Sequence, residues 1–174
     1  MKPFHFILPF FVVLVFAQSI MAGNTASVDP AGELQDAALN YEDAAKAQLS
    51  LANGLLRARL STRHEEEDDR LNLRKANAAL ELQAAEQLMA AAANLDHATR
   101  AWHAAAQAAS ESASRDFFRR AGRDAQQRAT SLMRRAAELA EHAALEFGAT
   151  ADLQQKANAS HRAGRIREQL AGRY

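Results

Sequence analysis

Long stretches of this chain repeat small apolar residues, mostly alanine, at alternating steps of three and four. That spacing places one apolar stripe along one side of a helix. In residues 93–109 the stripe consists of Leu95, Ala98, Trp102, Ala106 and Ala109. An alanine stripe buries little area, and it allows helix axes to approach each other closely. The best partner for such a stripe is another one, so the pattern predicts helices packed on helices.

Three long segments carry these stripes, and short connections between long helices favour antiparallel neighbours. We expect a first helix from just after Pro30 to about Leu60, then a tight reversal within 61–70. The stripes expected to be buried are Leu34, Ala38, Tyr41, Ala45, Leu49, Ala52, Leu56 and Leu60; then Leu73, Leu80, Ala84, Leu88, Ala91, Leu95, Ala98, Trp102, Ala106, Ala109 and Ala113; then Phe117, Ala121, Ala125, Ala129, Leu132, Ala136, Leu139, Ala143 and Phe147. A thinner stripe of Leu153, Ala157, Ala163, Ile166 and Leu170 predicts a shorter last helix. The fold class is therefore all-α: an elongated antiparallel helical bundle or coiled coil of three long Ala-rich helices plus a shorter C-terminal helix, in one domain over residues 31–171.

The boundaries follow from capping residues. Thr62 with Glu65 fits a capping box for the second helix, and Ser114 with Asp116 fits a cap for the third. We expect Gly148 to lie just past the third helix and Thr150 to cap the last one. The stretch 109–114 has no Gly or Pro to force a turn, so a continuous helix there is the alternative.

Residues 1–22 have the order of a secretory signal peptide: a basic residue, Lys2, an apolar run at 6–17, and then small residues. Cleavage is predicted before Ile20 or before Gly23, and an uncleaved membrane anchor is the alternative. The run is shorter than the roughly 20 residues that a spanning helix needs. We expect 23–30 to be a disordered segment, and the protein to be periplasmic or secreted. Because the sequence has no Cys, stability must come from helix packing without disulfides.

The remaining chain holds few residues arranged for catalysis. Without Lys2 it has 20 basic and 21 acidic groups, so its net charge makes a nucleic-acid binder unlikely. Phosphate-binding glycine loops and a nucleophile elbow are absent from the sequence. We therefore expect no catalytic residues, no cofactor and no metal.

The best metal-ligating constellation is the row Glu138, His142 and Glu146, spaced i, i+4, i+8. It lies on a flank of the third helix, where solvated pairs along the helix are the favoured interpretation and a surface zinc site the alternative. His97 and His103 are six residues apart and should not meet. We expect Trp102 to be a core anchor because it lies on the stripe.

Residues 115–135 carry seven Arg and two Asp, which is the most uneven charge distribution in the chain. Arg119, Arg120, Arg123 and Arg134 form a possible surface for an anionic partner, whereas Arg128 and Arg135 border the stripe. The alternative is a solvated face neutralised by acidic residues of a neighbouring helix. One hypothesis places the acidic run at 65–69 beside these arginines, where it would help set the register of the bundle.

These features favour an exported, non-enzymatic structural or interaction protein, acting as a scaffold, spacer or binding surface. Its partner would be another protein or a second copy of the chain, since an alanine core is marginal on its own. The alternative is a peripheral protein whose helices open onto an anionic membrane surface.

Overall fold

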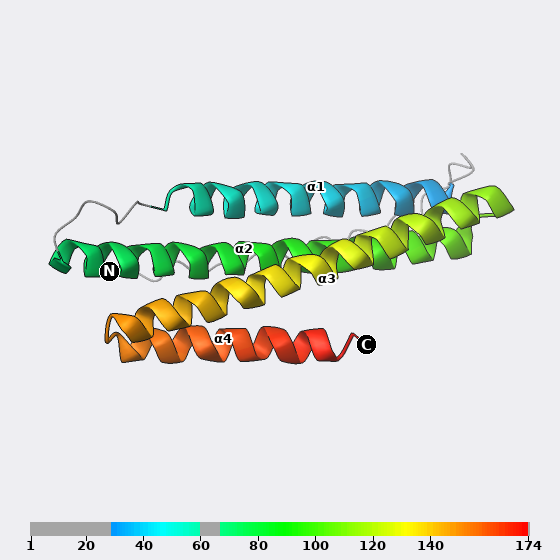
Figure 1. Ribbon diagram of the computed structural model, residues 1–174. Helices are drawn as coiled ribbons and strands as arrows, with labels where there is room; N and C mark the ends of the chain where they lie inside the picture. The colour runs from blue at the N-terminus through cyan, green and yellow to red at the C-terminus, as the bar shows by residue number, and fades with distance from the viewer. Residues whose placement is uncertain (1–28, 60–66, 174) are drawn as a thin grey trace, which may run out of the picture.

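The computed structural model describes residues 29–59 and 67–173 of the chain, and the described part consists of four helices without a strand. They are α1 (Pro30–Arg57), α2 (Glu67–Ala108), α3 (Ser112–Ala149) and α4 (Leu153–Ala171). Figure 1 shows them as a long rod in which consecutive helices run in opposite directions. The expected all-α, elongated antiparallel bundle is confirmed.

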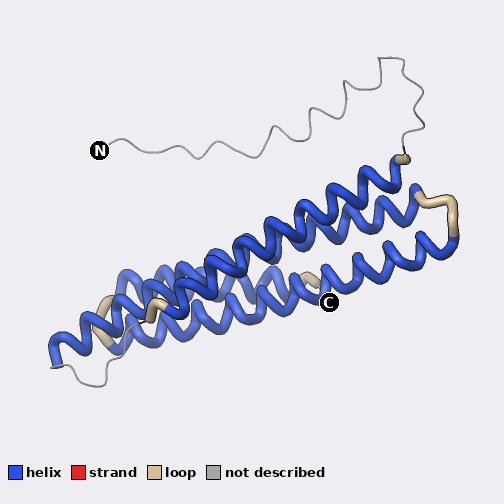
Figure 2. Tube along the Cα trace, turned by 90° about the horizontal axis from the view of Figure 1, so that it is seen from above, coloured by secondary structure: helices blue, strands red, loops and turns tan. Residues whose placement is uncertain are grey.

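Each helix packs mainly on its neighbours in the chain: α1 on α2, α2 on α3, and α3 on α4. As a result α1 and α4 lie on opposite sides of the α2–α3 pair (Figure 1). The shorter α4 runs along the C-terminal half of α3 and ends near the middle of the rod (Figure 2). The N-terminal half of α3 is consequently not covered by α4.

Helix α1 buries alanines at a seven-residue spacing, as expected for a helix in a coiled-coil seam. Its buried residues are Ala31, Ala38, Ala45 and Ala52. The helix begins at Pro30, and the Asp29 side chain caps it by accepting a hydrogen bond from the Ala31 amide at 3.1 Å. Proline fits this first position because its missing N–H would have no partner inside the helix.

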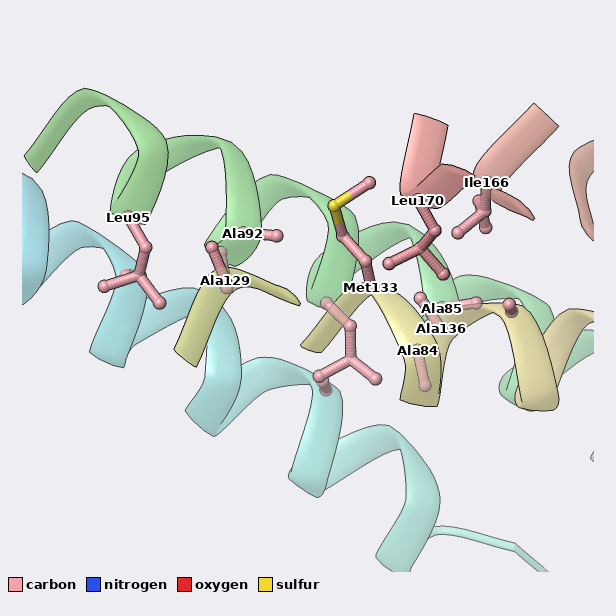
Figure 3. Packing of buried hydrophobic residues seen from close by; sticks show 14 of the residues in the cluster. Ala84, Ala85, Ala92, Leu95, Ala129, Met133, Ala136, Ile166 and Leu170 are labelled. Carbon is pink, nitrogen blue, oxygen red and sulfur yellow. The ribbon is translucent and has the colours of Figure 1, made fainter. Parts of the chain in front are cut away.

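The seam between α2 and α3 is made largely of methyl groups. Figure 3 shows Ala84, Ala85, Ala129 and Ala136 in this region, with the larger Leu95, Met133, Ile166 and Leu170 among them. At Gly122 the two helices approach so closely that an added Cβ would lie 3.4 Å from the Cβ of Trp102. The predicted packing of alanine stripes on one another is therefore confirmed.

Three details of the stripes and boundaries differ from the sequence expectations around the α2–α3 turn. Ala113, which was expected to continue the second stripe, lies in α3 and is exposed. Phe118 is buried and Phe117 is half-exposed, the reverse of the predicted order. Helix α3 begins at Ser112 after Glu111, whose side chain makes no capping hydrogen bond, so the predicted cap at Ser114 is wrong. The turn itself, within 109–111, is confirmed.

The turn between α3 and α4 also differs from prediction. Gly148 lies inside α3, and Ala151 takes the left-handed backbone conformation, with φ of 58°, that we expected glycine to supply. Asp152 caps α4 by accepting a hydrogen bond from the Gln155 amide at 3.2 Å, so the predicted cap at Thr150 is wrong. Leu153 and Ala157, which were expected on the buried stripe, are exposed, and the buried residues of α4 are Ala159, Ala163, Ile166 and Leu170.

Several predictions fall outside the described residues: the signal peptide at 1–22, the segment 23–28, the buried position of Leu60 and the Thr62–Glu65 capping box. Helix α1 ends at Arg57, three residues after Gly54, somewhat earlier than expected. Within 29–59 and 67–173, none of the helices is long and apolar enough to span a bilayer.

Candidate interaction surface

The arginines at 119, 120, 123 and 134 are all exposed on α3, and we call them the basic face. Arg119 lies 3.7 Å from the Asp116 carboxylate one turn earlier, and both side chains are more than half exposed. Arg120 donates from Nε to the backbone carbonyl of Asp116 at 3.3 Å. These contacts stay within one helix, so the guanidinium groups of Arg119 and Arg120 remain accessible to a partner.

The two arginines that border the stripe behave differently, because they contact α1. Arg128 pairs with the Glu42 carboxylate at 2.8 Å, and Arg135 donates to the Asn53 side-chain oxygen at 3.4 Å. Neutralisation by a neighbouring helix, the alternative for the whole segment, therefore applies to Arg128.

Glu42 also accepts a hydrogen bond from the indole Nε1 of Trp102 at 2.9 Å. Trp102 is 2% exposed, so its expected role as a core anchor is confirmed. Since Glu42 lies on α1, Trp102 on α2 and Arg128 on α3, this small network joins three helices.

An aromatic cluster lies beside the basic face at the α2–α3 end of the rod. The Trp102 and Phe118 rings are stacked at 5.7 Å, and Phe117 meets Trp102 edge-on at 6.1 Å. Phe117 is nevertheless 51% exposed. The half-exposed ring of Phe117 is thus held in place by aromatic contacts, and in the sequence it lies two and three residues before Arg119 and Arg120.

The acidic run at 65–69 does not lie beside these arginines. Its last residue, Asp69, is in the first turn of α2, and Arg74 one turn later pairs with Glu146 near the end of α3. Arg119 to Arg123 lie at the opposite end of α3, so for the described part of the run the register hypothesis is wrong.

Two members of the row of Glu138, His142 and Glu146, namely His142 and Glu146, contact α2 in place of forming pairs along α3. Glu146 accepts hydrogen bonds from Arg74 at 2.7 and 3.3 Å, and these bonds hold the pKa of Glu146 below its usual value. His142 Nδ1 lies 2.6 Å from a Glu81 oxygen. The solvated pairs that we favoured are therefore wrong for these two residues. Among the described residues no three potential ligands are grouped for a metal ion.

Sequence reasoning missed Glu81, which is only 1% exposed. Its second oxygen lies 2.9 Å from an Arg59 guanidinium nitrogen, so one buried carboxylate is held between Arg59 and His142. The spacing could have revealed it, because position 81 is three residues after Ala78 and four before Ala85, both buried. We therefore regard this cluster as part of the packing between α2 and α3.

The other histidines lie apart, as expected. His97 stacks on Tyr41 of α1 with ring centroids 5.1 Å apart. His103 faces α3, where its ring lies 3.4 Å from the Cβ position of Gly122.

The surface has hollows that the sequence did not lead us to expect. A groove of about 270 Å³ runs between α2 and α4, with Ala140 of α3 among its lining residues. A smaller one of about 170 Å³ lies between α1 and α3. A wider, polar hollow of about 550 Å³ lies at the α2–α3 end, lined by the start of α1 together with residues 108–111.

Comparison with family models, with curated proteins and with solved structures returned no match.

Proposed function

We propose that this chain is an exported, non-enzymatic interaction protein, in which a helical rod serves as a scaffold and presents the basic face of α3 to an anionic partner. The observation that carries the proposal is the outward position of Arg119, Arg120 and Arg123, which all remain exposed. Arginine is well suited to such a surface, because its planar guanidinium donates several hydrogen bonds to carboxylates or phosphates.

The construction of the rod supports a scaffold role. Buried methyl groups fix the spacing of α2 and α3, and the network of Trp102, Glu42 and Arg128 ties both helices to α1. The arginines of the basic face are thereby presented from a rigid helix, which reduces the entropy lost when a partner binds. The apolar run at 6–17 supports export.

Site-specific photo-cross-linking in the native cells tests the proposal. A cross-linking amino acid at Gln127, exposed on α3 between Arg123 and Arg134, should capture a partner. The same group at Ser160, exposed on α4, is the matched control and should capture far less. Fractionation of the same cells should place the protein outside the cytoplasm.

Equal capture at Gln127 and Ser160 would contradict the assignment of the basic face. Recovery of the protein from the cytoplasm alone would contradict export.

A further inference from the structure

We propose that the α2–α3 end of the rod docks on an anionic lipid surface, with Phe117 in the headgroup region and Arg119, Arg120 and Arg123 on lipid phosphates. The bundle stays closed as it docks. This inference rests on the proposed function, since it names the partner of the same basic face.

Basic and acidic residues are distributed unevenly between the two halves of the chain. Residues 112–173 carry 12 Lys and Arg against 7 Asp and Glu, whereas residues 29–111 carry 8 against 14. The net charge is near zero for the whole chain, but α3 and α4 are basic while the first two helices are acidic. An anionic surface therefore attracts one side of the molecule and repels the other, which orients the rod before contact.

The exposed ring of Phe117 favours lipid over a dissolved polyanion. It is 51% exposed although its neighbour Phe118 is buried, and its contacts with Trp102 and Phe118 hold it in place. A soluble polyanion offers an apolar ring nothing to bind. The boundary between headgroups and acyl chains accommodates such a ring when basic residues adjoin it.

The chain enters the bundle at the same end of the rod. Asp29 and Pro30 line one hollow together with Ser110, Glu111 and Phe118, so the polypeptide enters at the α2–α3 end. The apolar run at 6–17 precedes Asp29 by only eleven residues. Until the predicted cleavage, the most apolar segment of the sequence is therefore joined to the rod at the end that carries Phe117.

A closed bundle is favoured over helices that open onto the membrane. The faces that opening would release consist mostly of alanine, and each alanine contributes little apolar area to lipid. Opening would also break the contacts of Trp102 with Phe118 and Glu42. Docking through Phe117 and the nearby arginines leaves all of these contacts intact.

The test is sedimentation of the full chain with vesicles of phosphatidylcholine, with and without phosphatidylglycerol. Wild-type protein should prefer the anionic vesicles, and about 0.5 M NaCl should abolish that preference through screening. Replacing Arg119, Arg120 and Arg123 with Gln should weaken the anionic preference about 100-fold, or about fivefold for each arginine. Phe117→Ala should weaken binding about tenfold.

The matched control replaces Lys46, Arg57 and Arg70 with Gln, since these three exposed bases lie on α1 and α2, outside the basic half of the molecule. It should bind like the wild type. Because every variant keeps the apolar N-terminal run, the comparison isolates the contribution of the basic face. Equal loss in both triple variants, or no loss in either, overturns the inference.

Fluorescence of Trp102, the single tryptophan of the sequence, distinguishes closed docking from opening. Its emission should stay unchanged on anionic vesicles, whereas a red shift or quenching by brominated acyl chains overturns the closed form. If cross-linking at Gln127 captures an acidic protein while the vesicles never bind the basic face, the lipid inference fails and the proposed function stands.

Discussion

Ala129 offers the sharpest test of the packing between α2 and α3. Its side chain is 0% exposed and lies in the seam of methyl groups between these helices. Substitution Ala129→Leu adds three carbons at this point. We expect it to destabilise the protein, because the helices must move apart or the new side chain must leave its preferred rotamer.

The sign of the effect depends on how tightly the seam is packed. If there were room, burying three further carbons would add about 2.4 kcal/mol to the free energy of unfolding, at about 0.8 kcal/mol each. In a filled seam, overpacking subtracts about 1 to 3 kcal/mol instead. For a chain of this size each kcal/mol changes the melting temperature by about 2 to 4 °C, so Tm should fall by about 2 to 12 °C.

Thermal unfolding followed by circular dichroism measures the difference. Ala47→Leu is the matched control, since Ala47 is a solvent-exposed residue in the middle of α1, and alanine and leucine are both good helix formers. Its stability should change by less than about 0.5 kcal/mol. An Ala129→Leu variant that melts at a higher temperature than the wild type would refute the close packing of α2 on α3.

Two further predictions concern the ion pairs between helices. Replacing both Arg59 and His142 with Ala removes the two ion-pair partners of the buried Glu81 carboxylate, which should lower the free energy of unfolding in urea by about 3 to 5 kcal/mol. Adding Glu81→Leu to this variant should restore most of the lost stability. Failure of that rescue would show that the buried charge is not the cause. Arg74→Gln should make the stability of the fold less sensitive to acid. Because Arg74 lowers the pKa of Glu146, the stability that this ion pair contributes is complete above the ordinary glutamate pKa of 4.5 and is lost as the pH falls through the lowered pKa. The stability difference between wild type and Arg74→Gln should therefore be present at neutral pH and vanish in strong acid, and an equal difference at both would contradict the assignment.

The helices could be predicted from the sequence because burial of methyl groups repeats over many turns. Ala38, Ala45 and Ala52 are buried as the spacing requires, and so are Ala125 and Ala129. Local errors arose where two adjacent residues offer the same chemistry. Phe117 and Phe118 are both suitable for a core, and only the direction of α3 relative to Trp102 decides between them.

The ionic contacts could not be predicted, because they depend on which helix lies opposite. Glu146 was paired in our expectation with residues on its own helix, whereas its partner Arg74 is 72 positions away. The spacing places Glu81 on a buried stripe, but its partners Arg59 and His142 could not be predicted, because they lie far from it in the sequence. For the basic face the sequence identified the residues, and the structure added Phe117 and the end of the rod at which it lies.

The packing of helices on their neighbours in the chain has a consequence for how the protein acquires its shape. The helices that must meet are joined by short loops, so the loss of chain entropy on closing them is small. Such a local topology is typical of rapid folding. Helix α4 is the shortest and has the least extensive packing on its neighbour, so it should be the first to detach when the protein is pulled or heated.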